Sequence, residues 1–144
     1  METQDLWPDF FVEKVRGPKS ILQEQATFLK KKTKGILKAD VLTKTSQDQI
    51  YHFFRLISPA LNYYKYDLFS ISHGIELYPV TFDVGDNLAL LSELDTVLSP
   101  SDYTSFIAYD EPSFITALST VLKAPSTLRI IQNLYSQSLD ELPV

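Results

Sequence analysis

The chain has no cysteine, only four glycines and only two histidines, and each shortage removes a class of function. Without cysteine there are no disulfides, thiolate metal sites or cysteine nucleophiles. The two closest glycines, Gly74 and Gly85, are 11 positions apart. Glycine-rich loops that cradle phosphates need glycines within about five positions of one another, so they are absent, and no GxSxG motif for acyl transfer occurs.

Long apolar runs are also missing. The first residues, 1–8, are acidic and polar, and they have neither the basic start nor the apolar centre of a signal peptide. No window approaches the roughly 18 consecutive apolar residues that suggest a membrane-spanning helix. We therefore expect a cytoplasmic protein without a membrane partner.

Basic residues are scarce in one half of the chain and concentrated in the other. From Lys14 to Lys44 there are nine basic residues and two acidic ones, a net charge of +7. From Tyr66 to Leu122 there are nine acidic residues and no lysine or arginine, a net charge of −9. A fold that kept these zones apart would present one face to anions and another to cations.

The composition is that of a globular domain. The chain has 144 residues, of which 44% are hydrophobic and 22% are charged. This length is close to the commonest domain size and suffices for an ordinary core. We expect one domain over residues 1–144, in which an aromatic arm, 1–16, docks on the body and 140–144 form a tail.

Three stretches have helical periodicity. Apolar residues recur on one face over 18–33, and proline at position 18 suits the first turn of a helix. Two more stretches, 112–122 and 125–139, also open with proline and keep helical spacing. Residues 87–103 are ambiguous, because leucines at helical spacing are followed by proline and serines.

Strand patterns fill the middle of the chain. Alternating, β-branched and aromatic residues predict strands at 36–45, 49–57, 61–72 and 75–82. Because 49–57 is largely apolar on both faces, we expect a central strand covered on both sides. The polar cluster 44–48 predicts one hairpin and His73-Gly74 a second, short one.

The order of these elements predicts the fold class. A helix, about four strands and two further helices indicate an α+β protein. Its sheet would be a single antiparallel one of about four strands, with the N-terminal helix and two C-terminal helices packed on it. Residues 105–109 are also compatible with a short strand.

The two histidines are the candidates for acid–base chemistry. His52 lies in the most apolar predicted strand and His73 at a predicted turn, so both fit ordinary structural roles. The functional alternative is a small hydrolase or nuclease in which one histidine works with Asp67, Glu76 or Asp83. No HxxxH, HExxH or HxH spacing supports a metal site, and we expect no cofactor.

Two other groups of residues suggest binding. The first is a cluster of four lysines within five positions, which is suited to phosphate contact: Lys30, Lys31, Lys32 and Lys34. The second is a concentration of tyrosines, a residue type common at binding surfaces: Tyr51, Tyr63, Tyr64, Tyr66 and Tyr78. The sequence pI near 4.9 argues against a dedicated nucleic-acid binder, for which a basic domain is expected.

These observations favour a small non-catalytic interaction protein. Its partner would be another macromolecule, most simply a protein, bound through a tyrosine-rich sheet face and a charged zone. The predicted partner-binding residues are Tyr63, Tyr64, Tyr66, Tyr78, Asp83, Asp86, Glu93 and Asp95. In composition alone, the chain resembles bacterial toxin-neutralising (immunity) proteins. The alternatives are a phosphate or nucleic-acid binding module using the lysine cluster, and the histidine-dependent hydrolase.

Overall fold

The computed structural model describes residues 2–9, 16–85, 87–95 and 105–143. Its elements follow one another as α1 (Pro18–Lys32), β1 (Lys38–Ser46), β2 (Gln49–Ser58), the 3-10 turn η1 (Pro59–Leu61), β3 (Tyr64–His73), β4 (Val80–Asp83), α2 (Leu88–Asp95), β5 (Ser105–Ala108), α3 (Glu111–Lys123) and α4 (Pro125–Asp140). This order confirms the predicted α+β class. The sheet has five strands instead of about four, because β5 adds a short strand beyond β4.

The five strands form one antiparallel sheet in sequence order, β1-β2-β3-β4-β5. At its centre His52 lies opposite Thr43 on β1 and Ile71 on β3. Strand β4 pairs with β3 only over Ser70 to Ser72, so the first half of β3, residues 64–69, has no partner in β4. The sheet therefore has an open notch beside β3.

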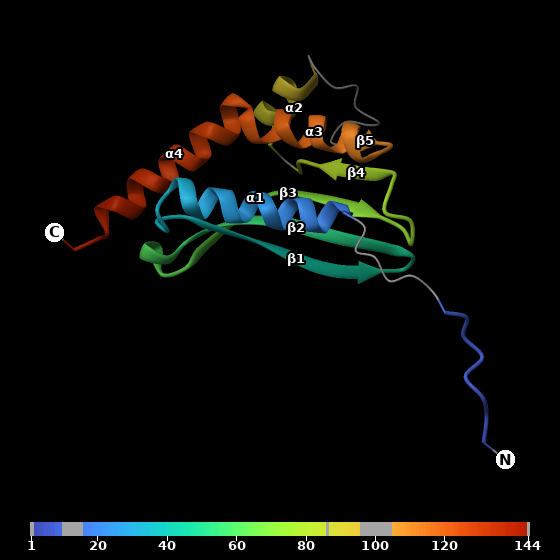
Figure 1. Ribbon diagram of the computed structural model, residues 1–144. Helices are drawn as coiled ribbons and strands as arrows, with labels where there is room; N and C mark the ends of the chain where they lie inside the picture. The colour runs from blue at the N-terminus through green and yellow to red at the C-terminus, as the bar shows by residue number, and fades with distance from the viewer. Residues whose placement is uncertain (1, 10–15, 86, 96–104, 144) are drawn as a thin grey trace.

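Helices α1, α3 and α4 lie on one side of the sheet (Figure 1). We call the face beneath them the inner face and the opposite one the outer face. The core lies between the inner face and the helices, and its largest fully buried side chains are Phe82, Phe114, Ile21, Leu22, Leu37, Leu56, Ile71, Leu90, Leu94, Val80, Val121 and Thr127. Phe82 and Phe114 join sheet and helix directly, with ring centroids 5.2 Å apart.

Local signals explain how the helices begin and end. Asp110 and Ser113 form a reciprocal capping box at the start of α3, where each side chain satisfies a backbone N–H of the other. At the end of α1 the N–H of Gly35 donates to the carbonyl of Lys30 over 2.8 Å. Gly35 has a φ of 81°, a conformation that glycine adopts without a steric penalty.

One of the two predicted hairpins is confirmed. Strands β1 and β2 are joined by the two residues Gln47 and Asp48. The short hairpin predicted at His73-Gly74 is wrong, because residues 74–79 separate β3 from β4. The His73 ring holds this longer loop: its Nδ1 lies 2.8 Å from the carbonyl oxygen of Gly74 and 3.1 Å from that of Glu76.

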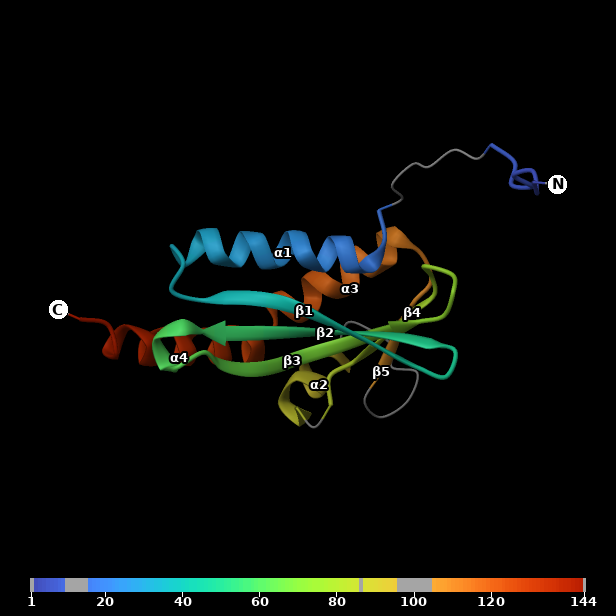
Figure 2. The same ribbon diagram turned by 90° about the horizontal axis from the view of Figure 1, so that it is seen from below.

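The prediction that β2 is covered on both sides is also wrong. Its inner residues His52, Phe54, Leu56 and Ser58 are buried, whereas the residues between them are only partly covered. Figure 2 shows the structure from below, with α3 and α4 behind the strands. The outer face of β2 is thus largely apolar, and none of the described helices lies over it.

The arm at residues 2–9 is exposed where it carries its large side chains. Leu6 and Trp7 are 85% and 77% exposed. The docking predicted for the arm stays a prediction, since part of that segment lies outside the described residues. Among the described helices, none is both long and apolar enough to cross a membrane alone; α3 and α4 pass that test only together, across a 53° bend.

Candidate functional site: the outer face of the sheet

Four large apolar side chains share the outer face of β1 and β2, all of them half-buried: Leu42, Tyr51, Phe53 and Ile57. With Arg55 they form what we call the outer patch. Leu42 lies directly opposite Phe53, and Arg55 lies opposite Asp40. Leu42 and Phe53 are cross-strand neighbours, and the other residues alternate along the same face of β2, so these five side chains lie side by side on one surface.

Arg55 is held in place within this patch. Its Nε donates to Asp40 Oδ1 over 2.8 Å and its Nη2 donates to Asp40 Oδ2 over 2.7 Å. This two-point geometry fixes the plane of the guanidinium group. The patch therefore presents an oriented arginine between Phe53 and Ile57 without having to order it on binding.

A second cation of the same face contacts the patch. Lys44 Nζ lies 5.6 Å from the centroid of the Phe53 ring, within the range of a cation–π contact. Other charges of the outer face have both signs: Lys38, Lys65, Asp67 and Asp83. Interleaved charges of this kind suit a mixed polar and apolar partner better than a uniformly anionic one.

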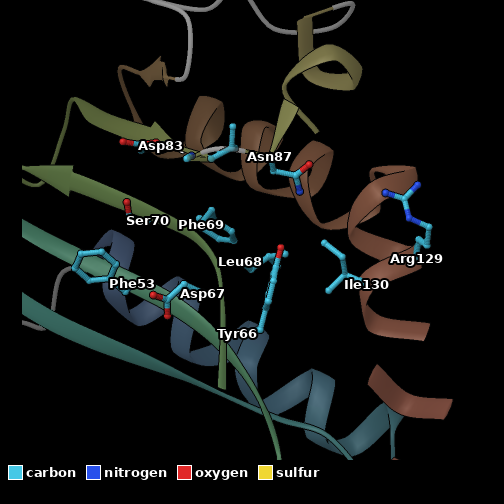
Figure 3. A pocket seen from close by; sticks show the side chains of 12 residues that line it. Phe53, Tyr66, Asp67, Leu68, Phe69, Ser70, Asp83, Asn87, Arg129 and Ile130 are labelled. Atoms are coloured by element: carbon cyan, nitrogen blue, oxygen red, sulfur yellow. Dashed lines mark hydrogen bonds between the residues drawn. The ribbon is translucent and has the colours of Figure 1, made fainter. Parts of the chain in front are cut away.

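The outer patch continues into an open hollow of about 660 Å³ beside the notch in the sheet. Phe53 belongs to both, and the hollow follows β3 from Tyr66 to Ser70. Figure 3 shows Arg129 and Ile130 reaching toward it from α4, opposite the strands. The candidate interface thus combines the outer patch with the hollow at its edge.

The tyrosines predicted to form one platform lie in different places. Tyr63 and Tyr64 are exposed just before and at the start of β3, and Tyr66 lines the hollow. Tyr78 lies beyond the other end of β3, where its ring packs 6.2 Å from that of Phe114. Burial, with the nearby Glu111 carboxylate, raises the pKa of Tyr78. Tyr51 lies on the outer face, whereas Tyr78 does not.

Two residues of the predicted acidic surface, Asp83 and Glu93, accept hydrogen bonds from backbone N–H groups of the chain itself. Asp83 accepts a hydrogen bond of 2.7 Å from the N–H of Gly85, within a turn. The Glu93 carboxylate accepts from the N–H of Ser126 at 2.8 and 3.0 Å, in the first turn of α4. Asp86, and the side chain of Asp95, lie outside the described residues. Glu93 is therefore a helix cap that ties α2 to α4.

The four predicted anion-binding lysines, Lys30, Lys31, Lys32 and Lys34, are all exposed at the end of α1. The last turn of a helix carries partial negative charge, which cations complement. Of the four, only Lys32 also lines a groove between the helices. Their position accounts for the charge run without a nucleic-acid ligand.

The two histidines meet on the inner face, a contact the sequence did not reveal. His52 Nε2 lies 3.1 Å from His73 Nε2, and both rings are buried. His52 Nδ1 lies 2.9 Å from the hydroxyl oxygen of Thr43. The arrangement is satisfied if His73 donates from Nδ1 to the loop carbonyls, His52 donates from Nε2 to His73, and Thr43 donates to His52.

The surroundings of His52 favour its neutral form. Burial, the nearby His73 and then Lys19 lower the pKa of His52 to about 4. The ring nitrogens contact each other, Thr43 and backbone carbonyls, whereas the hydrolase alternative required a carboxylate beside a histidine. Among the described residues no three His, Asp or Glu side chains are grouped to hold a metal ion. The geometry of the pair is that of a buried structural network.

One signal in the sequence does point to the outer face. The odd-numbered residues of β2 include two polar ones, Gln49 and Arg55. The even-numbered residues 50–56 are all apolar apart from His52. Polar residues at alternate positions of a strand mark the face that meets water.

No family model matches the chain, and neither a curated protein nor a solved structure is similar enough to match it.

Proposed function

We propose that this chain is a non-catalytic cytoplasmic binding domain that docks another protein on the outer face of its sheet. The observation that carries the proposal is the outer patch, in which Tyr51, Phe53 and Ile57 are half-buried and none of the helices that the structure describes lies over them. Covering such side chains with a partner removes apolar area from water, at roughly 25 cal/mol per Å². The apolar patch therefore supplies a driving force for association.

The chemistry of the patch favours a protein partner over a nucleic acid. Aromatic residues and arginine are the types most enriched in the energetically important centre of protein interfaces. Arg55 is neutralised by Asp40, and the same face carries Asp67 and Asp83. A phosphate backbone would meet these carboxylates, whereas a protein surface with charges of both signs can pair with them.

A crosslinking experiment tests the site directly. A photoreactive benzoylphenylalanine at position 51 should capture a protein in cells that make this chain, whereas the same group at Tyr109, an exposed position on the β5–α3 connection, should not. Equal capture at both positions would contradict the proposal.

The captured protein then allows a quantitative test. With purified partner, Phe53→Lys should weaken binding by about tenfold or more, as expected for a central interface residue. Leu139→Lys, on an exposed part of α4, is the matched control and should leave binding unchanged. A loss of binding only in a variant with Lys30, Lys31, Lys32 and Lys34 replaced by Gln, together with nucleic acid in the captured material, would instead support the phosphate-binding alternative.

A further inference from the structure

A second uncovered surface lies on the helical side of the sheet. A groove of about 600 Å³ runs between α1 on one side and α3 and α4 on the other. Phe54, Leu56 and Leu68 from the sheet form its apolar floor. Phe28 and Leu128 stand on opposite walls and are about half exposed, at 47% and 53%.

The rim of this groove is positively charged, although the whole chain carries −5. Its charged lining residues are Arg16, Lys32 and Lys123, and none of the acidic residues that the structure describes lines it. Arg16 is engaged with Glu24 at 2.7 Å and with Glu111 at 3.4 Å. The net positive charge beside the apolar groove therefore comes from Lys32 and Lys123. A segment with apolar residues flanked by acidic ones would complement this groove.

The chain contains such a segment in its own arm. Residues 2–9 carry the apolar pair Leu6 and Trp7 between the acidic residues Glu2, Asp5 and Asp9. Leu6 and Trp7 are largely exposed, and Phe28 and Leu128 on the groove walls are about half exposed, so both surfaces have apolar area that association could bury. Two copies can cover both at once if each arm enters the other copy's groove.

We propose that the arm, Glu2–Asp9, docks in the groove between α1 and α3/α4 of a second copy of this chain, so that two copies exchange arms. Trp7 and Gly17 are ten positions apart, and a fully extended chain over ten positions reaches about 33 Å. Helix α1, with 15 residues, is only about 22 Å long. The reach of the tether therefore exceeds the length of the helix that forms one wall of the groove. The outer patch on the opposite face remains accessible in this arrangement.

Trp7 is the only tryptophan in the chain, so its fluorescence reports on the arm alone. On concentration of the full chain, the sedimentation mass should double from the 16.4 kDa of one copy. Over the same range the Trp7 emission should shift to shorter wavelength and its quenching by acrylamide should fall several-fold. A chain that stays monomeric at all concentrations with a freely quenched Trp7 would overturn the proposal, and so would protection of Trp7 that does not depend on concentration, since that would place the arm in its own groove.

Paired variants separate docking from stability. Leu128→Glu on the groove wall should abolish both the mass increase and the fluorescence shift, whereas Leu139→Glu, on the same helix with 45% exposure and outside the groove, should preserve them. A circular-dichroism melt of each variant checks that it folds. Equal effects of the two substitutions on association would overturn the site.

The charge argument has its own test. Replacing Lys32 and Lys123 by Glu should weaken dimerisation several-fold, whereas the same change at Lys30 and Lys31, which do not line the groove, should have little effect. Adding Glu2→Lys and Asp9→Lys to the first variant should restore association. Failure of this charge reversal to restore it would contradict the pairing of arm and rim.

Discussion

His52 and His73 are 21 positions apart in the chain, yet their Nε2 atoms lie 3.1 Å apart beneath the helical layer. The antiparallel register of β2 and β3 sets this distance, because it places Ile50 opposite His73 and His52 opposite Ile71. Thr43 and two loop carbonyls complete the network at its ends. The pair links three strand segments and the β3–β4 loop through groups that are all satisfied in the neutral state.

The stability of the protein should fall as pH decreases from about 6.5 toward 4. The pKa of His52 is lowered to about 4 in the folded protein, whereas the unfolded chain titrates near 6.5. Between these values the unfolded state binds the extra proton, so folding loses on the order of 2 kcal/mol. Urea unfolding at pH 7.5, 5.5 and 4.5 measures this loss.

The variant His52→Gln isolates that effect. A glutamine amide can still donate toward His73 and accept from Thr43, but it does not titrate. The variant should be less stable than the natural protein at pH 7.5, and this difference should shrink as pH falls. A difference that stays constant with pH would show that the His52 proton is not the cause.

Much of the fold could be predicted because local signals agree with it. Prolines mark the starts of α1, α3 and α4, and helical spacing continues to within a residue or two of their observed ends. The polar cluster at 44–48 correctly marks the β1–β2 hairpin. In each case propensity, periodicity and turn chemistry favour the same structure, and the structure of such a segment can therefore be predicted from its sequence.

The site was harder to predict, because it depends on how segments are brought together. The contact between His52 and His73 requires the strand register, which alternation alone does not give. The sequence predicts a binding role for Tyr78 beside the other tyrosines, but the loop held by His73 turns it toward the core. The sequence likewise places Glu93 on a binding surface, whereas tertiary packing brings it to the first turn of α4.

Removal of the Glu93 carboxylate should destabilise the protein. The two carboxylate oxygens of Glu93 share the hydrogen of the Ser126 N–H in the first turn of α4, where a negative charge also complements the helix dipole. Glu93→Ala should therefore lower the free energy of unfolding by about 1–2 kcal/mol, as loss of a helix cap does. Glu76→Ala, at an exposed loop position, is the control and should change it by less than about 0.5 kcal/mol. Thermal and urea denaturation would both detect the difference.

A glycine at position 63 should stabilise the fold. Tyr63 has a φ of 58°, in the left-handed region that is unfavourable for a residue with a side chain. Tyr63→Gly should raise the free energy of unfolding by about 0.5–1 kcal/mol, since glycine adopts this conformation readily. Tyr64→Gly makes the same change one residue later, at the start of β3, and should destabilise instead. If both variants lose stability, the Tyr63 side chain makes a contact that outweighs its backbone strain.

The ion pair between Arg55 and Asp40 should be coupled measurably, because its two hydrogen bonds lie across neighbouring strands with both groups partly covered. In a double-mutant cycle with Arg55→Met and Asp40→Asn, the coupling free energy should be about 0.5–1 kcal/mol at low salt. It should decrease at 1 M salt, where charges are screened over about 3 Å. The variant Asp40→Asn also tests the role of Arg55 in the outer patch, because it leaves an arginine that is no longer oriented or neutralised. Binding of a protein partner should then weaken, even though every apolar residue of the patch is intact. Unchanged binding would show that the apolar side chains alone account for recognition.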